Sequence, residues 1–287
     1  MQRLAVELAA SWTDQREGRL HGRRGGARRR QAGAGRKHEL VFTDRLLATL
    51  IYLRLDLPQR VLAVLFGVGQ ATIARAVSEV RPLLATRGYA VAGRPGVRLR
   101  TLADVFAYAE AEGVTLRLDA TETQVRRPAA GKPGRRAFIS GKKNLNTIKT
   151  TVISDAAGRT LWTGASRPGR QHDQTAARTE GIDDQLDHHP TVRVLVDAGY
   201  RGLRRDHKRQ VIAPPPGPRK NIEISAATAE IRTRARRRQS RARIPVEHAI
   251  GRHKHWRGVR RWIHRRDRLA QTYQAVAGLV SDRDAIR

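Results

Sequence analysis

Apolar residues in the first third of the chain recur at helical spacing. They cluster on one face of a predicted helix over residues 43–53, and a second helix is expected over residues 59–66. A sharp turn, Gly67-Val68-Gly69, precedes a third predicted helix that starts at Gln70 and carries an apolar stripe along one side. Pro82 is expected to end or kink this third helix.

A helix, a glycine turn and a further helix have the geometry of a helix-turn-helix. In that motif the second helix lies in the major groove of DNA and presents its N-terminal residues to base edges. We expect Gln70, Thr72 and Arg75 to contact DNA, with Glu79 also on the exposed side. An ordinary helical hairpin that packs on a neighbour would give the same pattern. The basic surroundings favour DNA binding.

Beyond residue 112 the pattern changes to that of strands. The five expected strands are Val114 to Leu118, Thr147 to Ile153, Thr160 to Thr163, Val192 to Val196 and Gln210 to Ala213. Helical stretches fall between the third and fourth strands and after the fifth. This order predicts an α/β fold whose sheet has mixed strand directions.

Composition divides the chain into four parts. Residues 1–38 turn from a short apolar stretch into Gly, Ala and Arg, which predicts a basic arm that stays mobile until DNA orders it. Residues 39–95 form the all-α helix-turn-helix domain, and residues 96–112 form a connecting helix after a boundary rich in Gly and Pro. Residues 113–287 form the α/β domain.

The charge of the chain points to nucleic acid. Lys and Arg number 57 against 26 Asp and Glu, a net charge of +31 that requires a polyanionic partner such as DNA. Aromatic residues make up 5% of the chain, which argues against a protein that grips single strands by base stacking. No signal peptide or long apolar run is seen, so we expect a cytoplasmic, nucleoid-associated protein with no membrane partner.

Two acidic residues follow directly on apolar strand runs. Asp119 follows residues 116–118 and Asp197 follows residues 194–196, so each carboxylate is expected at the end of a strand. If those strands are neighbours, both groups project into one crevice. The chain has no Cys, so a metal there must bind oxygen or imidazole, and paired carboxylates suit Mg²⁺ or Mn²⁺. Either Asp alone is equally typical of a turn cap.

A third carboxylate, Glu247, lies in the most basic stretch of the chain. Pro245 is expected to start a helix that places Glu247 in its first turn. Residues 219–261 contain 14 Lys or Arg against 3 acids. A Glu in these surroundings is a favourable charge at a helix N-terminus, an ion-pair partner, or a metal ligand that faces a phosphate channel.

Together these acids resemble the catalytic motif of bacterial insertion-sequence transposases of the Asp-Asp-Glu (DDE) class, in the fifth insertion-sequence family and its relatives. The resemblance is carried by Asp119, by Asp197-Ala198-Gly199-Tyr200 and by Glu247. In that family the third motif reads Tyr, two residues, Arg, three residues, Glu, six residues, Lys. Arg243 and Lys254 match it around Glu247 at those spacings.

The similarity covers the chain from about residue 40 to its end. It includes Ser140-Gly141-Lys142-Lys143, Lys149-Thr150 and Gly169-Arg170-Gln171-His172-Asp173. Ser240 stands at the Tyr position of the third motif, a departure that concerns a DNA contact near the scissile phosphate and bears on whether this copy is active.

The resemblance implies a ribonuclease H-like catalytic domain that cuts and joins DNA with two divalent ions, Mg²⁺ or Mn²⁺. Asp119 would bridge the ions, and Asp197 and Glu247 would flank them. Water would be the nucleophile for first-strand cleavage, and the freed 3′-hydroxyl would attack in strand transfer. The DNA partners would be the terminal inverted repeats of the element and its target, bound by a homo-oligomer.

Further residues are expected around these three acids. Phosphates would be held by Lys142, Lys143, Arg243 and Lys254, and the accessory residues are Tyr200, His172 and Asp173. Glu122 is a possible substitute for Asp119, whereas Asp155 has the position of a hairpin-turn residue. His253 and His255 are expected to contact phosphate or solvent rather than zinc.

Two other classes of function stay open. A metal-dependent endonuclease of the same fold would share the three acids but would give no joined products. A regulator that binds DNA through the helix-turn-helix alone would not need them.

Overall fold

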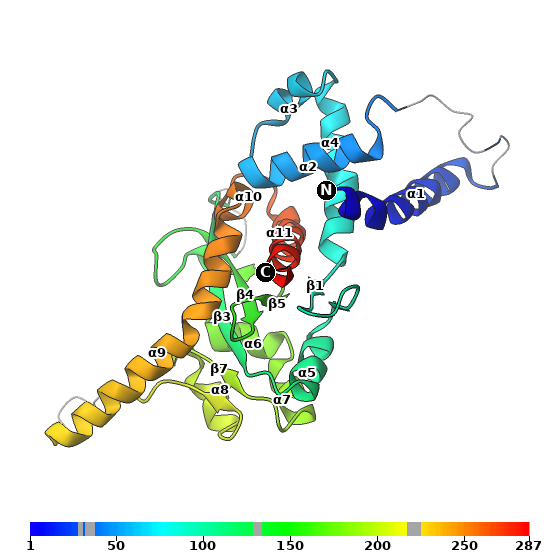
Figure 1. The fold of residues 1–287 in the computed structure, drawn as a ribbon. Helices are drawn as coiled ribbons and strands as arrows, with labels where there is room; N and C mark the ends of the chain where they lie inside the picture. Colours follow the sequence, from blue (N-terminus) through cyan, green and yellow to red (C-terminus); the bar gives the residue numbers. More distant parts are fainter. Residues whose placement is uncertain (28–30, 32–37, 129–133, 217–224, 287) are drawn as a thin grey trace.

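The computed structural model describes residues 1–27, 31, 38–128, 134–216 and 225–286. The helices are α1 (Gln2–Arg24), α2 (Phe42–Leu55), α3 (Gln59–Leu65), α4 (Gln70–Thr86), α5 (Leu102–Ala111), α6 (Asp173–Thr179), α7 (Ile182–His188), α8 (Arg201–Asp206), α9 (Ala226–Lys254), α10 (Arg257–Arg260) and α11 (Leu269–Ala285), with 3₁₀ turns η1 (Arg135–Phe138), η2 (Ala198–Tyr200) and η3 (Arg266–Arg268) (Figure 1). The strands are β1 (Tyr89–Ala90), β2 (Arg98–Leu99), β3 (Leu116–Val125), β4 (Thr147–Ser154), β5 (Thr160–Thr163), β6 (Arg167–Pro168), β7 (Val194–Leu195), β8 (Val211–Ile212) and β9 (Arg261–Trp262).

Helix α1 corrects the expectation that residues 1–38 form an arm without fixed structure. Leu8 is buried, the Trp12 indole donates a hydrogen bond to Glu79 (3.1 Å), and Glu7 pairs with Arg87 (2.7 Å). These contacts dock α1 on α4, although the mean hydropathy of the segment is low. The Arg-rich part of the expected arm, residues 28–30 and 32–37, lies outside the described residues.

The helix-turn-helix forms as predicted. Helices α3 and α4 meet at 105° across the turn at Gly67, whose φ of 61° favours glycine. The apolar stripe of α4 is buried, from Ile73 to Leu84. No single described helix is long and apolar enough to cross a membrane, and α3 with α4 meets that test only as a bent pair, by length and composition alone.

Helix α4 does not end at Pro82. It continues to Thr86, whose hydroxyl donates to the Pro82 carbonyl (3.1 Å). The reason is the buried face, which extends past the proline to Leu84 and packs against α11. Tertiary packing thus compensates for the backbone hydrogen bond that proline cannot donate.

The sheet of the second part has mixed strand directions, as expected. Its order is β5-β4-β3-β7-β8, with β3, β4 and β5 antiparallel and with β7 and β8 parallel to β3. This is the ribonuclease H-like arrangement implied by the resemblance. Strand β3 is longer than predicted because it pairs with β4 along its whole length, so Asp119 lies inside a strand and not at its end.

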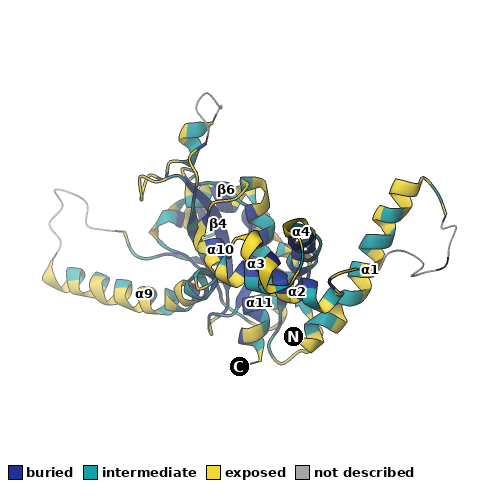
Figure 2. Cartoon of the chain, turned by 90° about the horizontal axis from the view of Figure 1, so that it is seen from above, coloured by how far each residue is buried: buried dark blue, intermediate teal, exposed yellow. Residues whose placement is uncertain are grey.

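Helix α9 differs most from the expectation. Pro245 does not start it: the helix begins after Ser225, whose hydroxyl accepts a hydrogen bond from the Thr228 amide, and runs for 29 residues. Arg117 donates to the Ala242 carbonyl (2.7 Å), in the turn of the helix that precedes the proline. The N-terminal half of α9 projects away from the body and is largely exposed (Figures 1 and 2).

The helical part and the sheet part share one apolar core. Helix α11, the last in the chain, packs against α4 on one side and against β5 and β1 on the other. Its Tyr273 and Val276 are buried in the same cluster as Leu46 of α2 and Val152 of β4. The two parts are therefore held together by a buried surface and not by a linker alone.

His253 on α9 is part of this core, which corrects the expectation of a phosphate contact or a solvated residue. It is fully buried, and its ring nitrogens hydrogen-bond to Thr160 (2.9 Å) and to the Tyr273 hydroxyl (3.0 Å). Burial, with a smaller effect of Arg252, lowers the pKa of His253 to about 3. The imidazole is therefore neutral at physiological pH.

We predict that His253→Gln makes the free energy of unfolding less dependent on pH. The unfolded chain takes up a proton on His253 as the pH falls through about 6.5, whereas the folded chain does not until the pH nears about 3. Stability from this residue is thus present above about pH 6.5 and lost below it, by about 2 kcal/mol at pH 5. Urea unfolding at several pH values measures it, with His255→Gln as the control. An unchanged pH dependence in His253→Gln would contradict the prediction.

Candidate active site

The strand register brings Asp119 and Asp197 together. Strands β3 and β7 are parallel neighbours, with Leu116 opposite Val194 and Arg117 opposite Leu195. Asp119 and Asp197 each lie three residues beyond the first pair, so both carboxylates belong to the same level of the sheet. The two strands are thus neighbours, which is the condition under which both carboxylates reach one crevice.

Asp119 is largely buried and lies near other carboxylates. Its side chain is 17% exposed and accepts hydrogen bonds from the Ala120 amide (2.8 Å) and from Arg243 Nη2 (3.1 Å). Burial raises the pKa of Asp119 to about 6 against the opposing effect of Arg243, and the charges of Asp197 and Asp173 raise it further. Asp119 therefore loses its proton less readily than an exposed aspartate does, and a nearby cation favours the ionised form.

Glu247 faces the same arginine from α9. Its carboxylate is 4.0 Å from Arg243 Nη2 and 56% exposed, so Arg243 bridges Asp119 and Glu247. Gln239, earlier on α9, donates to the Val196 carbonyl (2.6 Å) and fixes the helix to the end of β7. Among the described residues, no three His, Cys, Asp or Glu side chains are close enough to hold a metal ion together. The positively charged guanidinium of Arg243 lies between the carboxylates of Asp119 and Glu247.

Asp173, expected as an accessory residue, adds a carboxylate to this cluster. A side-chain carbon on Gly199 would lie 2.9 Å from Asp197 Oδ1 and 3.5 Å from Asp173 Oδ2. Lys149 of β4 is 8% exposed, and its ammonium donates to Asp173 and to the Gln171 carbonyl (2.6 Å). Asp173 thus already has a cation of its own. Lys149 and Gly199 belong to the motifs that carry the resemblance, although neither has a predicted role there.

Tyr200 completes the inner wall of the site. It is fully buried, and its hydroxyl has no hydrogen-bond partner among the described residues. Burial raises its pKa well above the usual value, and the carboxylates of Asp173, Asp119, Asp197 and Glu180 add to this effect, in that order. The phenol therefore stays protonated and lies near all four acids.

Two further residues differ in how they relate to the acids. The Glu180 carboxylate is 3% exposed, and burial raises its pKa to about 7 although Arg167 lies 3.8 Å away. No local sequence pattern distinguishes Glu180 as part of the site.

His172 precedes α6 and is exposed, without a hydrogen bond to any acid among the described residues.

Lysine side chains also lie near the acids. Lys254 Nζ is 3.5 Å from the Glu122 carbonyl, and burial and then the charge of Lys143 lower its pKa. Lys142 and Lys143 follow Ser140, whose hydroxyl accepts hydrogen bonds from both backbone amides (3.3 and 3.1 Å). Lys143 and Lys254 therefore form a basic rim beside the acids.

The competing carboxylates are occupied elsewhere. Glu122 accepts a hydrogen bond from the Thr147 hydroxyl (3.1 Å). Asp155 caps the β4–β5 hairpin by accepting from the Ala157 and Arg159 amides (3.0 and 2.8 Å), which confirms its assignment as a turn residue.

The helix-turn-helix keeps only some of its expected DNA contacts. Gln70 and Arg75 are exposed on α4. Thr72 is 8% exposed and its hydroxyl donates to Glu39 (3.1 Å), so it does not face DNA as predicted. Glu79 is also turned inward and pairs with Arg45 (3.0 Å). Both positions lie beside the buried stripe: Glu79 accepts a hydrogen bond from Trp12 of α1, and Thr72 donates to Glu39 before α2.

The chain matches two known protein families. Residues 118–281, more than half of the chain, match the DDE superfamily endonucleases. Residues 38–90 match the helix-turn-helix of DDE superfamily endonucleases. The chain is also 25% identical over 218 residues to the "Probable transposase for insertion sequence element IS702" of Microchaete diplosiphon, which covers 75% of this chain and 70% of that protein.

Solved structures give weaker likenesses. The Mos1 transposase paired-end complex with left transposon end is 10% identical, with a TM-score of 0.20, over 88% of this chain and 82% of that chain. A pre-cleavage Mos1 transpososome is 11% identical, with a TM-score of 0.19, at the same coverage. TM-scores this low carry no argument about shared geometry.

We predict that Gly199→Ala disrupts the acid cluster without unfolding the chain. The added carbon would lie 2.9 Å from Asp197 Oδ1, closer than real contacts allow, so Asp197 must move. A displacement of about 1 Å in a reacting group can cost about 100-fold in rate. The shift needed here is smaller, so we expect a loss of about tenfold in metal-dependent DNA cleavage. The control is Gly18→Ala, where a side-chain carbon meets nothing within 4 Å. Cleavage by Gly199→Ala at the wild-type rate would contradict this placement.

Proposed function

The chain belongs to the DDE superfamily endonucleases, and we propose that it is the DNA transposase of an insertion sequence. It would bind the terminal inverted repeats of its element, cut the DNA there and join the freed ends to a target. The observation that carries this proposal is the position of Asp119 and Asp197 at the same level of the neighbouring segments that contain β3 and β7, with Arg243 between Asp119 and Glu247. The helix-turn-helix match and the IS702 relative support it.

Enzymes of this family depend on divalent metal ions, and the donor chemistry of the site fits them. Its acids are carboxylates and the chain has no Cys, which is typical of sites for hard cations. We propose that Asp119, Asp197 and Glu247 hold two Mg²⁺ or Mn²⁺ ions. Bound there, such ions polarise phosphate oxygens and lower the pKa of water.

The side chains themselves would do three things. Above about pH 6, Asp119 loses its proton and becomes available to a cation. Arg243 pairs with the ionised Asp119 and, once a cation displaces it, is placed to bind a phosphate oxygen. Lys143 and Lys254 hold the DNA backbone beside the acids, with Lys142 next to them, and give position and charge stabilisation rather than proton transfer. No residue needs to form a covalent bond to DNA.

DNA would reach the site along two basic surfaces. Gln70 and Arg75 lie exposed on α4, where a recognition helix presents side chains to bases. The projecting half of α9 adds exposed arginines, among them Arg237, Arg238 and Arg241. Each chain has one acid cluster whereas an element has two ends, so we propose that the protein works as a homo-oligomer on DNA, at the nucleoid.

We predict that Asp119→Asn, Asp197→Asn and Glu247→Gln each abolish Mg²⁺-dependent cleavage of terminal-repeat DNA. Each substitution removes a charge that holds a cation, while the helix-turn-helix is untouched, so DNA binding should stay within about twofold of wild type. Cleavage of labelled duplex and its binding without metal measure the two effects. The repeats can be read from the DNA that flanks the gene.

The same assay separates the alternatives. Cut ends without joined products would favour an endonuclease without strand transfer, and metal-free binding with no cleavage would favour a regulator. If one of the three variants kept wild-type cleavage, that residue would not be a ligand, and Glu122 or Asp173 would take its place.

We also predict that Arg75→Ala weakens binding to the terminal repeats more than binding to random duplex. A side chain that reads a base edge contributes about 1–3 kcal/mol of discrimination, and Arg75 is exposed on α4 with no ion-pair partner among the described residues. Competition binding against both DNAs measures the difference, with Arg193→Ala as the remote control. Equal losses on the two DNAs would make Arg75 a phosphate contact instead.

A further inference from the structure

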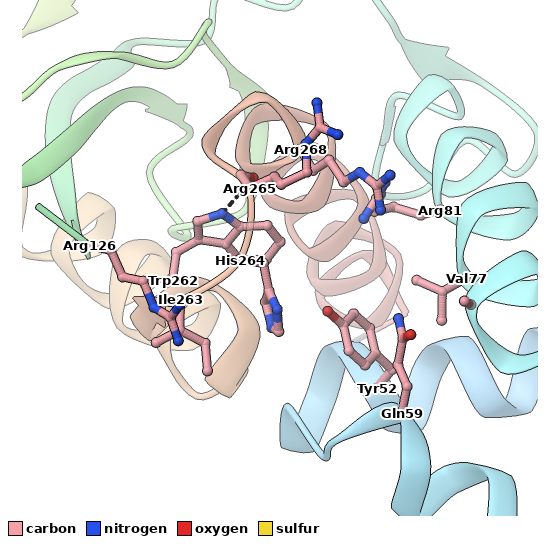
Figure 3. A pocket seen from close by; sticks show the side chains of 11 residues that line it. Tyr52, Gln59, Val77, Arg81, Arg126, Trp262, Ile263, His264, Arg265 and Arg268 are labelled. Carbon is pink, nitrogen blue, oxygen red and sulfur yellow. Dashed lines mark hydrogen bonds between the residues drawn. The ribbon is translucent and has the colours of Figure 1, made fainter. Parts of the chain in front are cut away.

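A basic cavity of about 480 Å³ lies at the junction of the helix-turn-helix and the sheet (Figure 3). Its helical side is formed by α2, α3 and α4, and its other side by the end of β3, by β9 and by the residues that lead into α11. The polar and basic side chains that line the cavity include Tyr52, Arg81, Arg126, His264, Arg265 and Arg268. None of the residues that line it among the described part of the chain is Asp or Glu.

Three of these arginines have no carboxylate partner among the described residues. Arg81 is 5% exposed, and the one hydrogen bond of its guanidinium in the described structure goes to Gln271 (3.0 Å). Arg126 and Arg268 are exposed at the rim, and neither side chain forms a described ion pair. Burial, and then the nearby charge of Arg268, lower the pKa of Arg81. Like charges gathered at a half-buried site are stabilised by a bound anion.

The nearest carboxylates are already paired with other groups. Asp56 binds His264 (2.9 Å), and Asp267 binds Arg265 (2.9 Å) in a largely exposed pair. The Tyr52 hydroxyl has no hydrogen bond in the described structure, and burial raises its pKa to about 12, so it stays a donor. The cavity therefore offers donors and positive charge to a ligand that brings its own negative charge.

The position of the cavity identifies a candidate ligand. Along α4, Arg81 is eleven residues from Gln70, roughly 16 Å at 1.5 Å per residue. Along β3, Arg126 is seven residues from Asp119, roughly 23 Å at 3.3 Å per residue. Both spans are shorter than one turn of B-DNA, about 34 Å. A duplex that reaches from the helix-turn-helix to the acids is thus long enough to pass this cavity.

We propose that the junction cavity binds the phosphates of the DNA backbone, one through Arg81 and Arg268 and a neighbouring one through Arg126 (Figure 3). This inference rests on the proposed function, because it takes the polyanion to be the DNA that the enzyme cuts. Guanidinium groups suit a phosphate, which they can bind through two parallel hydrogen bonds. The side chains come from both parts of the chain, so the bound phosphate would also tie α4 to α11. Trp262 is buried and leaves no face for base stacking, so the contact is independent of sequence.

The test is the salt dependence of DNA binding without metal. Each phosphate contact adds about 0.9 to the slope of log K against log salt. For the double variant Arg126→Gln with Arg268→Gln we expect the slope on a random duplex to fall by about 0.9 to 1.8. The matched control, Arg193→Gln with Arg205→Gln, removes the same charge from exposed positions outside the cavity and should leave the slope unchanged. Both variant pairs are exposed, so neither disturbs the core.

A second measurement does not depend on any variant. Phenylglyoxal modifies accessible arginines, so bound duplex should protect Arg126 and Arg268 several-fold while Arg193 stays reactive. If orthophosphate at equal ionic strength protected them as well as duplex, the cavity would be a site for free phosphate and not for the backbone.

The outcomes separate this inference from the proposed function. Equal slopes for the two double variants, with no protection by duplex, would overturn the cavity site even if wild-type protein cut and joined DNA normally. A reduced slope with protection, in a protein that neither cuts nor joins DNA, would support the cavity site and overturn the transposase.

Discussion

The crowding of carboxylates at one end of the sheet is the constraint on which the site depends. Asp119, Asp197 and Asp173 lie close enough to raise the pKa of the first, and the fold places a cation against each side of the cluster. Arg243 pairs with Asp119, and Lys149 pairs with Asp173. Burial is the largest cause of the raised pKa of Asp119, and the neighbouring carboxylates add to it. The negative charge that Arg243 and Lys149 balance is also the charge that a divalent cation would balance.

The rest of the catalytic part positions these charges. The parallel pairing of β3 with β7 fixes the level of the two aspartates, and α9 is tied to the sheet at two points, through Gln239 and Arg117. Because α9 is continuous through Pro245, its exposed basic half and its acid-facing half form a single rigid element.

The helix-turn-helix is not an independent module in this chain. Helix α11 packs on α4 and also on the sheet, and α1 covers the far side of α4 through Trp12 and Glu79. These contacts hold α4 against the part of the chain that carries the acids. Between them lies the junction cavity, whose arginines come from both parts of the chain.

The sequence alone determined the properties that depend on neighbours in the chain. Net charge predicted DNA, and the lack of Cys predicted carboxylate or imidazole ligands. The resemblance of Asp119, Asp197 and residues 243–254 to a family motif implied a DDE site, and the helical stripe predicted the helix-turn-helix. Only the tertiary structure decided which strands adjoin, and so that Asp119 meets Asp197. It also decided that Thr72 and His253 are buried. The reason is physical: periodicity reports that one face of an element is covered, but the covering group and the strand register depend on packing between segments far apart in the chain.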